Sequence, residues 1–142
     1  MKELAKIQEV FRSNKPTLFV DPNHCSECEE HNQVLLDHTI DTISLSELGN
    51  PGWDPICFVD RQGFKYYLPA LARLSLGTGD QYYLGQFLFH LNPDRIREFT
   101  RPEASAVADF LEALVESIPE EIDCNLDSDG VLACIENLRA NA

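Results

Sequence analysis

The sequence predicts a single α+β domain over residues 1–142, predominantly helical, with about five to six helices and one small β-hairpin. Three observations support this prediction. Apolar residues recur at helical spacing in several segments, two short β-prone runs flank a glycine-containing turn, and no repeat, low-complexity tract or linker divides the chain. With 142 residues, of which 44% are hydrophobic, the chain can build one core without disulfide bonds.

The expected helices share apolar residues spaced three or four positions apart. The clearest helix begins after Thr100-x-x-Glu103, which is a capping-box pattern, and ends before Pro119. Residues 81–91 are apolar nearly all round, which is typical of a buried helix. Ser44-x-x-Glu47 is a second capping-box pattern and indicates one short helical turn. Further helices are expected over residues 2–13, 70–76 and 131–139. Another is expected to begin in the second half of residues 24–31 and to continue through residue 36.

The expected hairpin lies in the middle of the chain. The apolar runs 56–59 and 64–68 form its strands, and residues 60–63 form its turn, where Gly63 allows a positive φ. Pro69 follows the second run and suits the first position of the next helix. Residues 17–20 are a further short β-prone run, which Asp21 and Pro22 end with a turn signal.

Two histidines and two cysteines within residues 24–31 are the strongest indication of chemistry in the sequence. The spacing Cys25-x-x-Cys28 is that of a metal-binding knuckle, and thiolates with imidazoles suit zinc. Positions three apart on a helix are neighbours, so Cys28 and His31 can approach one ion. The pattern predicts a zinc site whose first three ligands are Cys25, Cys28 and His31.

A tetrahedral zinc site needs a fourth ligand, and the sequence leaves its identity open. His24 is adjacent to the knuckle, whereas Cys57 would join the knuckle to the expected hairpin. His38 lies two helical turns beyond His31, which is far for the same ion. We prefer Cys57 or His24 without choosing between them.

The knuckle also allows two other interpretations. The first is an ordinary surface turn whose thiols are incidental. The second is a redox pair, because a Cys-x-x-Cys at a helix start has a lowered thiol pKa. Three nearby acidic residues, Glu27, Glu29 and Glu30, oppose thiolate formation, and the βαβ context of thioredoxin is missing, so the redox interpretation is not preferred.

A second metal candidate lies near the C-terminus. Asn125, Asp127, Asp129 and Glu136 nearly match the ligand spacing of an EF-hand calcium loop, with Gly130 at the sharp turn. Asn at the first position and the short exit helix count against calcium. We favour the alternative that these residues cap the last helix.

The charge balance restricts the kinds of partner. The chain has 24 acidic and 11 basic residues, a net charge of −13, which argues against binding to nucleic-acid phosphates or to anionic membranes. Residues 98–142 hold 11 of the acidic and 2 of the basic residues. No run is long and apolar enough for a membrane span, no signal-peptide core appears, and the five cysteines are an odd number. We expect a cytoplasmic protein with reduced thiols.

The segments 49–59 (GNPGWDPICFV) and 63–71 (GFKYYLPAL), taken with the knuckle, resemble an uncharacterised family of small bacterial proteins, a domain-of-unknown-function family. The resemblance covers residues 20–140 and implies a bacterial cytoplasmic protein without an assigned reaction. It carries over no catalytic residue, and it implies that Cys57 belongs with the knuckle.

The leading functional hypothesis is a small acidic accessory or interaction protein with a structural zinc site. One alternative is an inhibitor or immunity-type protein whose acidic face, residues 98–142, occupies a basic partner. Another is a metal-dependent enzyme with an open zinc site. The chain lacks a Ser-His-Asp pattern, a phosphate-binding glycine loop and an HExxH sequence. A non-enzymatic role is therefore favoured, with His90 a capping or hydrogen-bonded histidine and Asp54 a turn residue.

Overall fold

The structure, a computed structural model, describes all 142 residues and is built from helices alone. Nine α-helices and two short 3₁₀ helices follow one another without a strand, so the predicted α+β class is wrong. Their bounds are α1 Lys2–Val10, α2 Ser26–Asp37, α3 Leu45–Leu48, η1 Pro55–Phe58, α4 Arg61–Leu74, η2 Gly79–Gln81, α5 Leu84–His90, α6 Pro93–Arg97, α7 Arg101–Ser117, α8 Pro119–Cys124 and α9 Ser128–Ala140.

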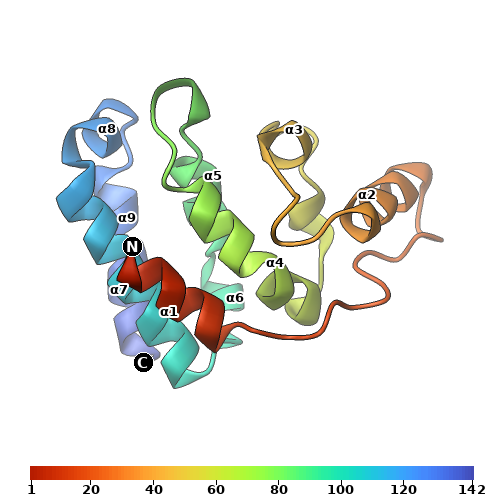
Figure 1. The fold of residues 1–142 in the computed structure, drawn as a ribbon, viewed down its shortest axis with the longest axis horizontal. Coiled ribbons are helices and arrows are strands. Elements are labelled where there is room, and N and C mark those ends of the chain that lie inside the picture. Colours follow the sequence, from red (N-terminus) through yellow and green to blue (C-terminus); the bar gives the residue numbers. More distant parts are fainter.

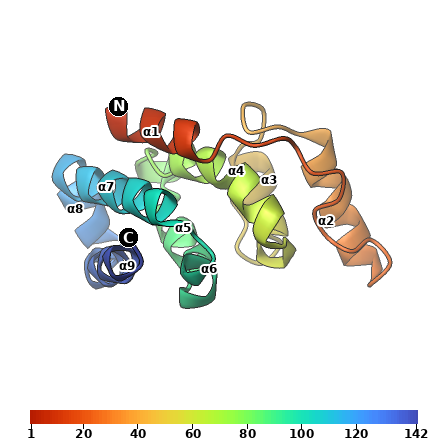
Figure 2. The ribbon, with the colours of Figure 1, turned by 90° about the horizontal axis from the view of Figure 1, so that it is seen from below.

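The helices are arranged along one long axis (Figure 1). At one end, α7 packs against α1 and α9, and both chain termini lie there. The helices α4, α5 and α6 occupy the middle, and α2 stands at the opposite end (Figures 1 and 2). A non-helical segment, residues 11–25, runs from α1 along the molecule to α2, as Figure 2 shows. The knuckle therefore lies at the end of the molecule farthest from the termini.

The longest helix, α7, confirms its predicted start. The Thr100 side chain accepts a hydrogen bond from the Glu103 backbone N–H, and the Glu103 carboxylate accepts one from the Thr100 N–H. A similar box between Ser44 and Glu47 begins α3. Each box satisfies backbone donors that the first helical turn leaves free.

The predicted hairpin is wrong because both of its runs are helical. The first run becomes the 3₁₀ helix η1, which Asp54 caps through a hydrogen bond from the Ile56 N–H. The second lies inside α4, and Asp60 is the N-cap of this helix because its Oδ1 accepts a hydrogen bond from the Gly63 N–H at 2.8 Å. A capping aspartate was thus misread as the start of a tight turn.

The residues after Asp60 show why a helix forms there. Phe64, Tyr67, Leu68 and Leu71 are all 1% exposed or less and lie at helical spacings of three, four and seven. Pro69, predicted to start a helix, lies inside α4 and removes one backbone hydrogen bond from it. Burial of this apolar face outweighs the proline, so α4 forms the centre of the core.

The other predicted β-prone run, residues 17–20, also forms no strand. The backbone N–H groups of Phe19 and Val20 instead donate to the Asn32 side-chain oxygen on α2, at 2.9 and 3.1 Å. The Phe19 ring packs 5.2 Å from the ring of Tyr67. The buried side-chain oxygen of Asn32 thus accepts backbone hydrogen bonds that a neighbouring strand would otherwise accept.

Long side chains fix the C-terminal end of α2 to the body. The Tyr67 hydroxyl donates to the Leu35 carbonyl at 2.5 Å, and Lys15 Nζ donates to the carbonyls of Leu36 and His38. These carbonyls belong to the last turn of the helix, where no further backbone N–H is available. The structure contains no helix that combines the length and the apolar character required to cross a bilayer.

Replacing Asp60 with alanine tests the helical assignment of residues 61–74. We expect Asp60→Ala to lower the free energy of unfolding by about 1 kcal/mol, because the cap of α4 is lost. Chemical denaturation measures the change. Asp41→Ala is the control, since Asp41 is exposed and its side chain makes no hydrogen bond. Equal stability of the two variants would contradict the cap.

Candidate metal centre

The first turn of α2 positions the two knuckle cysteines. Cys25 is the N-cap residue, with an extended backbone, and its Sγ accepts a hydrogen bond from the Cys28 backbone N–H at 3.4 Å. Sulfur here takes the place that a serine or aspartate oxygen usually has at a helix start. Cys25 is exposed and Cys28 is buried.

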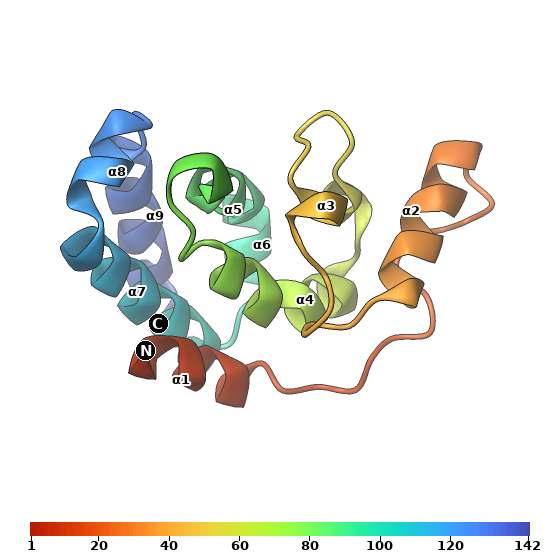
Figure 3. The same cartoon turned by 45° about the horizontal axis from the view of Figure 1, so that its top comes forward.

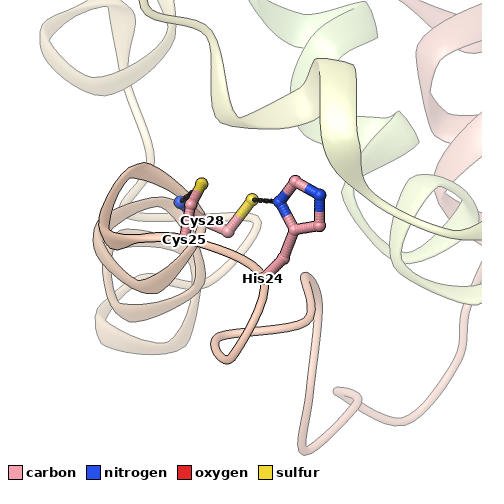
Figure 4. Close-up of side chains that lie close together, drawn as sticks. All are labelled: His24, Cys25 and Cys28. Carbon is pink, nitrogen blue, oxygen red and sulfur yellow. Dashed lines mark hydrogen bonds between the residues drawn. The ribbon is translucent and has the colours of Figure 1, made fainter.

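His24 completes a group of three possible ligands. One ligand atom each from His24, Cys25 and Cys28 lies within 4.8 Å of the other two. His24 Nδ1 and Cys28 Sγ point toward each other at 3.5 Å (Figure 4). A tetrahedral zinc ion holds a thiolate sulfur and an imidazole nitrogen about 3.6 Å apart. The separation already matches one edge of such a site.

A hollow of about 290 Å³ opens beside this group. Its wall combines the three ligand residues with two carboxylates and two apolar side chains. The lining residues are Val20, Asp21, His24, Cys25, Glu27, Cys28 and Phe58.

The two thiols differ in acidity. Hydrogen bonds to its sulfur, first from the Cys28 backbone and then from His24, lower the pKa of Cys25 to about 7. The pKa of Cys28 is raised, because its side chain hydrogen-bonds to Cys25 and because it is buried, with the charge of Glu27 adding to this effect. Hydrogen bonding with Cys25 raises the pKa of His24. The helix start thus outweighs the nearby carboxylates at Cys25.

His31, predicted as a ligand, lies outside the group. Its ring is fully buried, stacks on Phe58 with 5.2 Å between centroids and contacts Trp53 at 4.7 Å. Its Nε2 lies 3.3 Å from Glu27 Oε1, whereas its Nδ1 is buried without a partner. His38 is also elsewhere, near Thr42 and Glu47.

Cys57 lies in a second group, with Asp54 and His90, and not at the knuckle. The ligand atoms of these three residues also lie within 4.8 Å of one another. Asp54 and His90 are buried, and Cys57 is exposed. Burial, followed by the charge of Asp54, raises the pKa of the Cys57 thiol. Two separate groups in the structure therefore could hold a metal ion.

Hydrogen bonding distinguishes the second group from the first. His90 Nε2 donates to Asp54 Oδ2 at 2.7 Å, and Arg95 Nη1 donates to His90 Nδ1 at 3.2 Å. Arginine can only donate, so His90 carries its proton on Nε2 and has no free lone pair. A cation would have to displace one of these bonds and approach the Arg95 guanidinium. The second group is therefore already satisfied, and the knuckle group is the better metal site.

Sequence reasoning missed the partners in this buried network. Asp54 was interpreted as a turn residue, and His90 as a capping or hydrogen-bonded histidine without a named partner. The two residues are 36 positions apart and bond to each other. Gln86, one helical turn before His90, also donates to Asp54 at 3.1 Å. Gln86 and His90 share one face of α5, which is the signal that could have indicated a common partner.

The candidate calcium ligands, which the sequence analysis did not favour, do not converge. Asp127, Asp129 and Glu136 form no group of neighbouring carboxylates. Asp127 occupies the N-cap position of α9, but its side chain makes no capping hydrogen bond, so the favoured side-chain cap is wrong. Its Oδ2 instead accepts a hydrogen bond from the Tyr82 hydroxyl at 2.5 Å. This carboxylate therefore joins α9 to the segment before α5.

Comparison of the chain with protein-family models, with curated proteins and with solved structures found no match. The resemblance to a family of small bacterial proteins therefore stays a prediction. The site must be interpreted from its own geometry.

The pH dependence of Cys25 alkylation tests the electrostatics of the knuckle. In reduced, metal-free protein, we expect Cys25 to react with iodoacetamide with a midpoint near pH 7, because the thiolate is the nucleophile and forms above the pKa of about 7. Peptide mass spectrometry after timed labelling measures this. Cys57, also exposed but with a raised pKa, is the internal control. A Cys25 midpoint at or above that of Cys57 would contradict the helix-start arrangement.

Proposed function

We propose that this protein binds one Zn²⁺ ion through His24, Cys25 and Cys28, and that it acts as a small acidic accessory protein of the cytoplasm. The observation that carries the proposal is the convergence of three soft ligand atoms within 4.8 Å at an exposed helix start. These donor types select zinc over calcium or magnesium, which prefer oxygen ligands.

The acidity of Cys25 supports zinc binding. Cysteine binds a metal as the thiolate, so each ligating thiol must lose its proton. At neutral pH, Cys25 has already lost much of this proton because its pKa is about 7. The net charge of −13 also favours the approach of a cation.

The proposed role of the zinc is structural. Residues 21–24 form a turn that enters α2, and only short-range hydrogen bonds, such as that from the Asn23 N–H to Asp21 Oδ1, organise it. An ion held by His24 and by the two cysteines would fasten this turn to the first turn of α2. The adjacent hollow leaves room for a further ligand.

A second function, exchange with protein disulfides, is favoured by the asymmetry of the two thiols. Cys25 is exposed at a helix start and Cys28 is buried behind it. In this reaction the Cys25 thiolate attacks a substrate disulfide and releases one substrate thiol. The Cys28 thiolate then displaces the second substrate thiol, which leaves a Cys25–Cys28 disulfide and a reduced substrate.

Zinc titration of the reduced protein tests the first function. We expect one tightly bound ion per chain, measured by competition with a chromophoric chelator. Cys25→Ser and Cys28→Ser should each weaken binding by about 100-fold, because a structural zinc gains ~10–16 kcal/mol from about four ligands. Cys124→Ser is the matched control, since Cys124 is exposed at the end of α8.

Two outcomes would contradict zinc binding at the knuckle. One is unchanged affinity in both knuckle variants, and the other is reduced protein that binds no zinc. In the second case, a Cys25–Cys28 disulfide that forms in air and is reduced by a dithiol would favour the exchange function.

A further inference from the structure

We propose that Glu27 supplies the fourth zinc ligand through its free carboxylate oxygen, and that the buried ring of His31 holds this carboxylate in position. This inference rests on the proposed zinc site and names the group that closes it. It would make the centre a Cys₂HisGlu site of this chain alone, without a ligand from a partner.

Glu27 lies beside the three proposed ligands. It lies between the two knuckle cysteines in sequence and lines the same hollow as His24, Cys25 and Cys28. Its carboxylate makes a single hydrogen bond, through Oε1, to His31 Nε2 at 3.3 Å. The other oxygen, Oε2, accepts no hydrogen bond. Glu27 is not among the three residues whose ligand atoms already converge within 4.8 Å, so its carboxylate would have to swing toward the ion while Oε1 keeps its hydrogen bond to His31.

The His31 ring is held in one orientation by its neighbours. The ring is 0% exposed and lies against Phe58 and Trp53, which fix its orientation. An ionised carboxylate can only accept, so His31 must carry a proton on Nε2 and donate it to Glu27. A buried histidine that orients a metal-binding carboxylate is a familiar second layer of such sites.

The unpartnered Nδ1 of His31 supports this assignment. A buried polar atom without a partner costs about 1–3 kcal/mol. The fold retains this cost at a position where a phenylalanine would satisfy the two aromatic neighbours equally well. The hydrogen bond to Glu27 is the one interaction in the structure that requires an imidazole there.

The negative charge of Glu27 also favours a bound metal ion. Glu27 and Cys28 line the same hollow, so the negative charges of a carboxylate and a thiolate repel each other there. A bound Zn²⁺ ion offsets this repulsion, because the two thiolates and the carboxylate are then all attracted to one divalent cation. The carboxylate therefore favours the metal-bound form over an empty pair of thiolates.

Neutralising Glu27 tests the inference, with Asp21 as a matched control. Both carboxylates line the hollow, and Glu27→Gln and Asp21→Asn remove the same charge. We expect Glu27→Gln to weaken Zn²⁺ binding by about 10- to 100-fold, whereas Asp21→Asn should change it by less than about fivefold. In Co²⁺-loaded protein, Glu27→Gln should alter the ligand-field bands and leave the thiolate charge-transfer bands in place.

His31→Phe separates positioning from folding. Phenylalanine keeps the contacts with Trp53 and Phe58 and removes both the donor and the unpartnered nitrogen, so we expect no loss of stability. Zinc affinity should fall by about 10-fold in the otherwise unchanged protein and should not fall further when Glu27→Gln is already present. Additive losses would overturn the positioning role.

The failure of this inference is distinguishable from that of the proposed function. If the unchanged protein binds no zinc, the zinc site itself is wrong. If it binds zinc with the two cysteines as ligands, but Glu27→Gln matches Asp21→Asn in affinity and in its Co²⁺ spectrum, then Glu27 is not a ligand and this inference alone is overturned.

Discussion

The buried hydrogen bond between Asp54 and His90 is the interaction on which the rest of the arrangement depends. It joins η1 to α5 at 2.7 Å, with both side chains removed from solvent. Arg95 extends the contact to α6, because its guanidinium donates both to His90 and to the Ile56 carbonyl of η1. A single polar cluster thus joins three short elements, η1, α5 and α6. Removing one partner from such a cluster leaves the others buried and unpaired.

The 3₁₀ helix η1 connects this hydrogen-bonded cluster to the knuckle. It ends at Phe58, which stacks on His31 and also lines the hollow beside the cysteines. Figure 3 shows α2 at the end of the molecule, beyond α3 and separated from α5. The position of α2 therefore depends on η1, on the Asn32 contact with residues 19–20 and on the Tyr67 hydroxyl. The end that carries the candidate metal site is held to the body by a few polar contacts and one aromatic stack.

The sequence predicted the helices whose starts carry their own signal. Thr100 with Glu103 marks a helix start by local chemistry, and this chemistry does not depend on distant residues. The Ile56–Leu68 region was misjudged because a short apolar run fits a strand and a buried helix equally well. Only packing decides between them, and the packing of Phe64 and Tyr67 requires the helical spacing.

The sequence likewise indicated only some of the residues that the structure brings together at the candidate site. Cys25 and Cys28 were found because three-residue spacing at a helix start is local, and His24 was retained as one of two preferred choices for the fourth ligand. The assignment of His31 assumed that helical neighbours converge. In the structure, the aromatic contacts of His31 with Trp53 and Phe58 turn its ring away from the ligand group. These contacts join positions more than 20 residues apart, and no short motif reveals them.

The location of a bound zinc ion distinguishes between the two groups of possible ligands. We expect the metal to bind at the knuckle group of His24, Cys25 and Cys28 and not at the group of Asp54, Cys57 and His90, where His90 has no free lone pair. A crystal structure of the zinc-loaded protein, with anomalous data at the zinc edge, shows the ion directly. We expect one peak about 2.3 Å from the sulfurs of Cys25 and Cys28 and adjacent to His24 Nδ1. A peak at the second group, or none at the knuckle, would contradict this expectation.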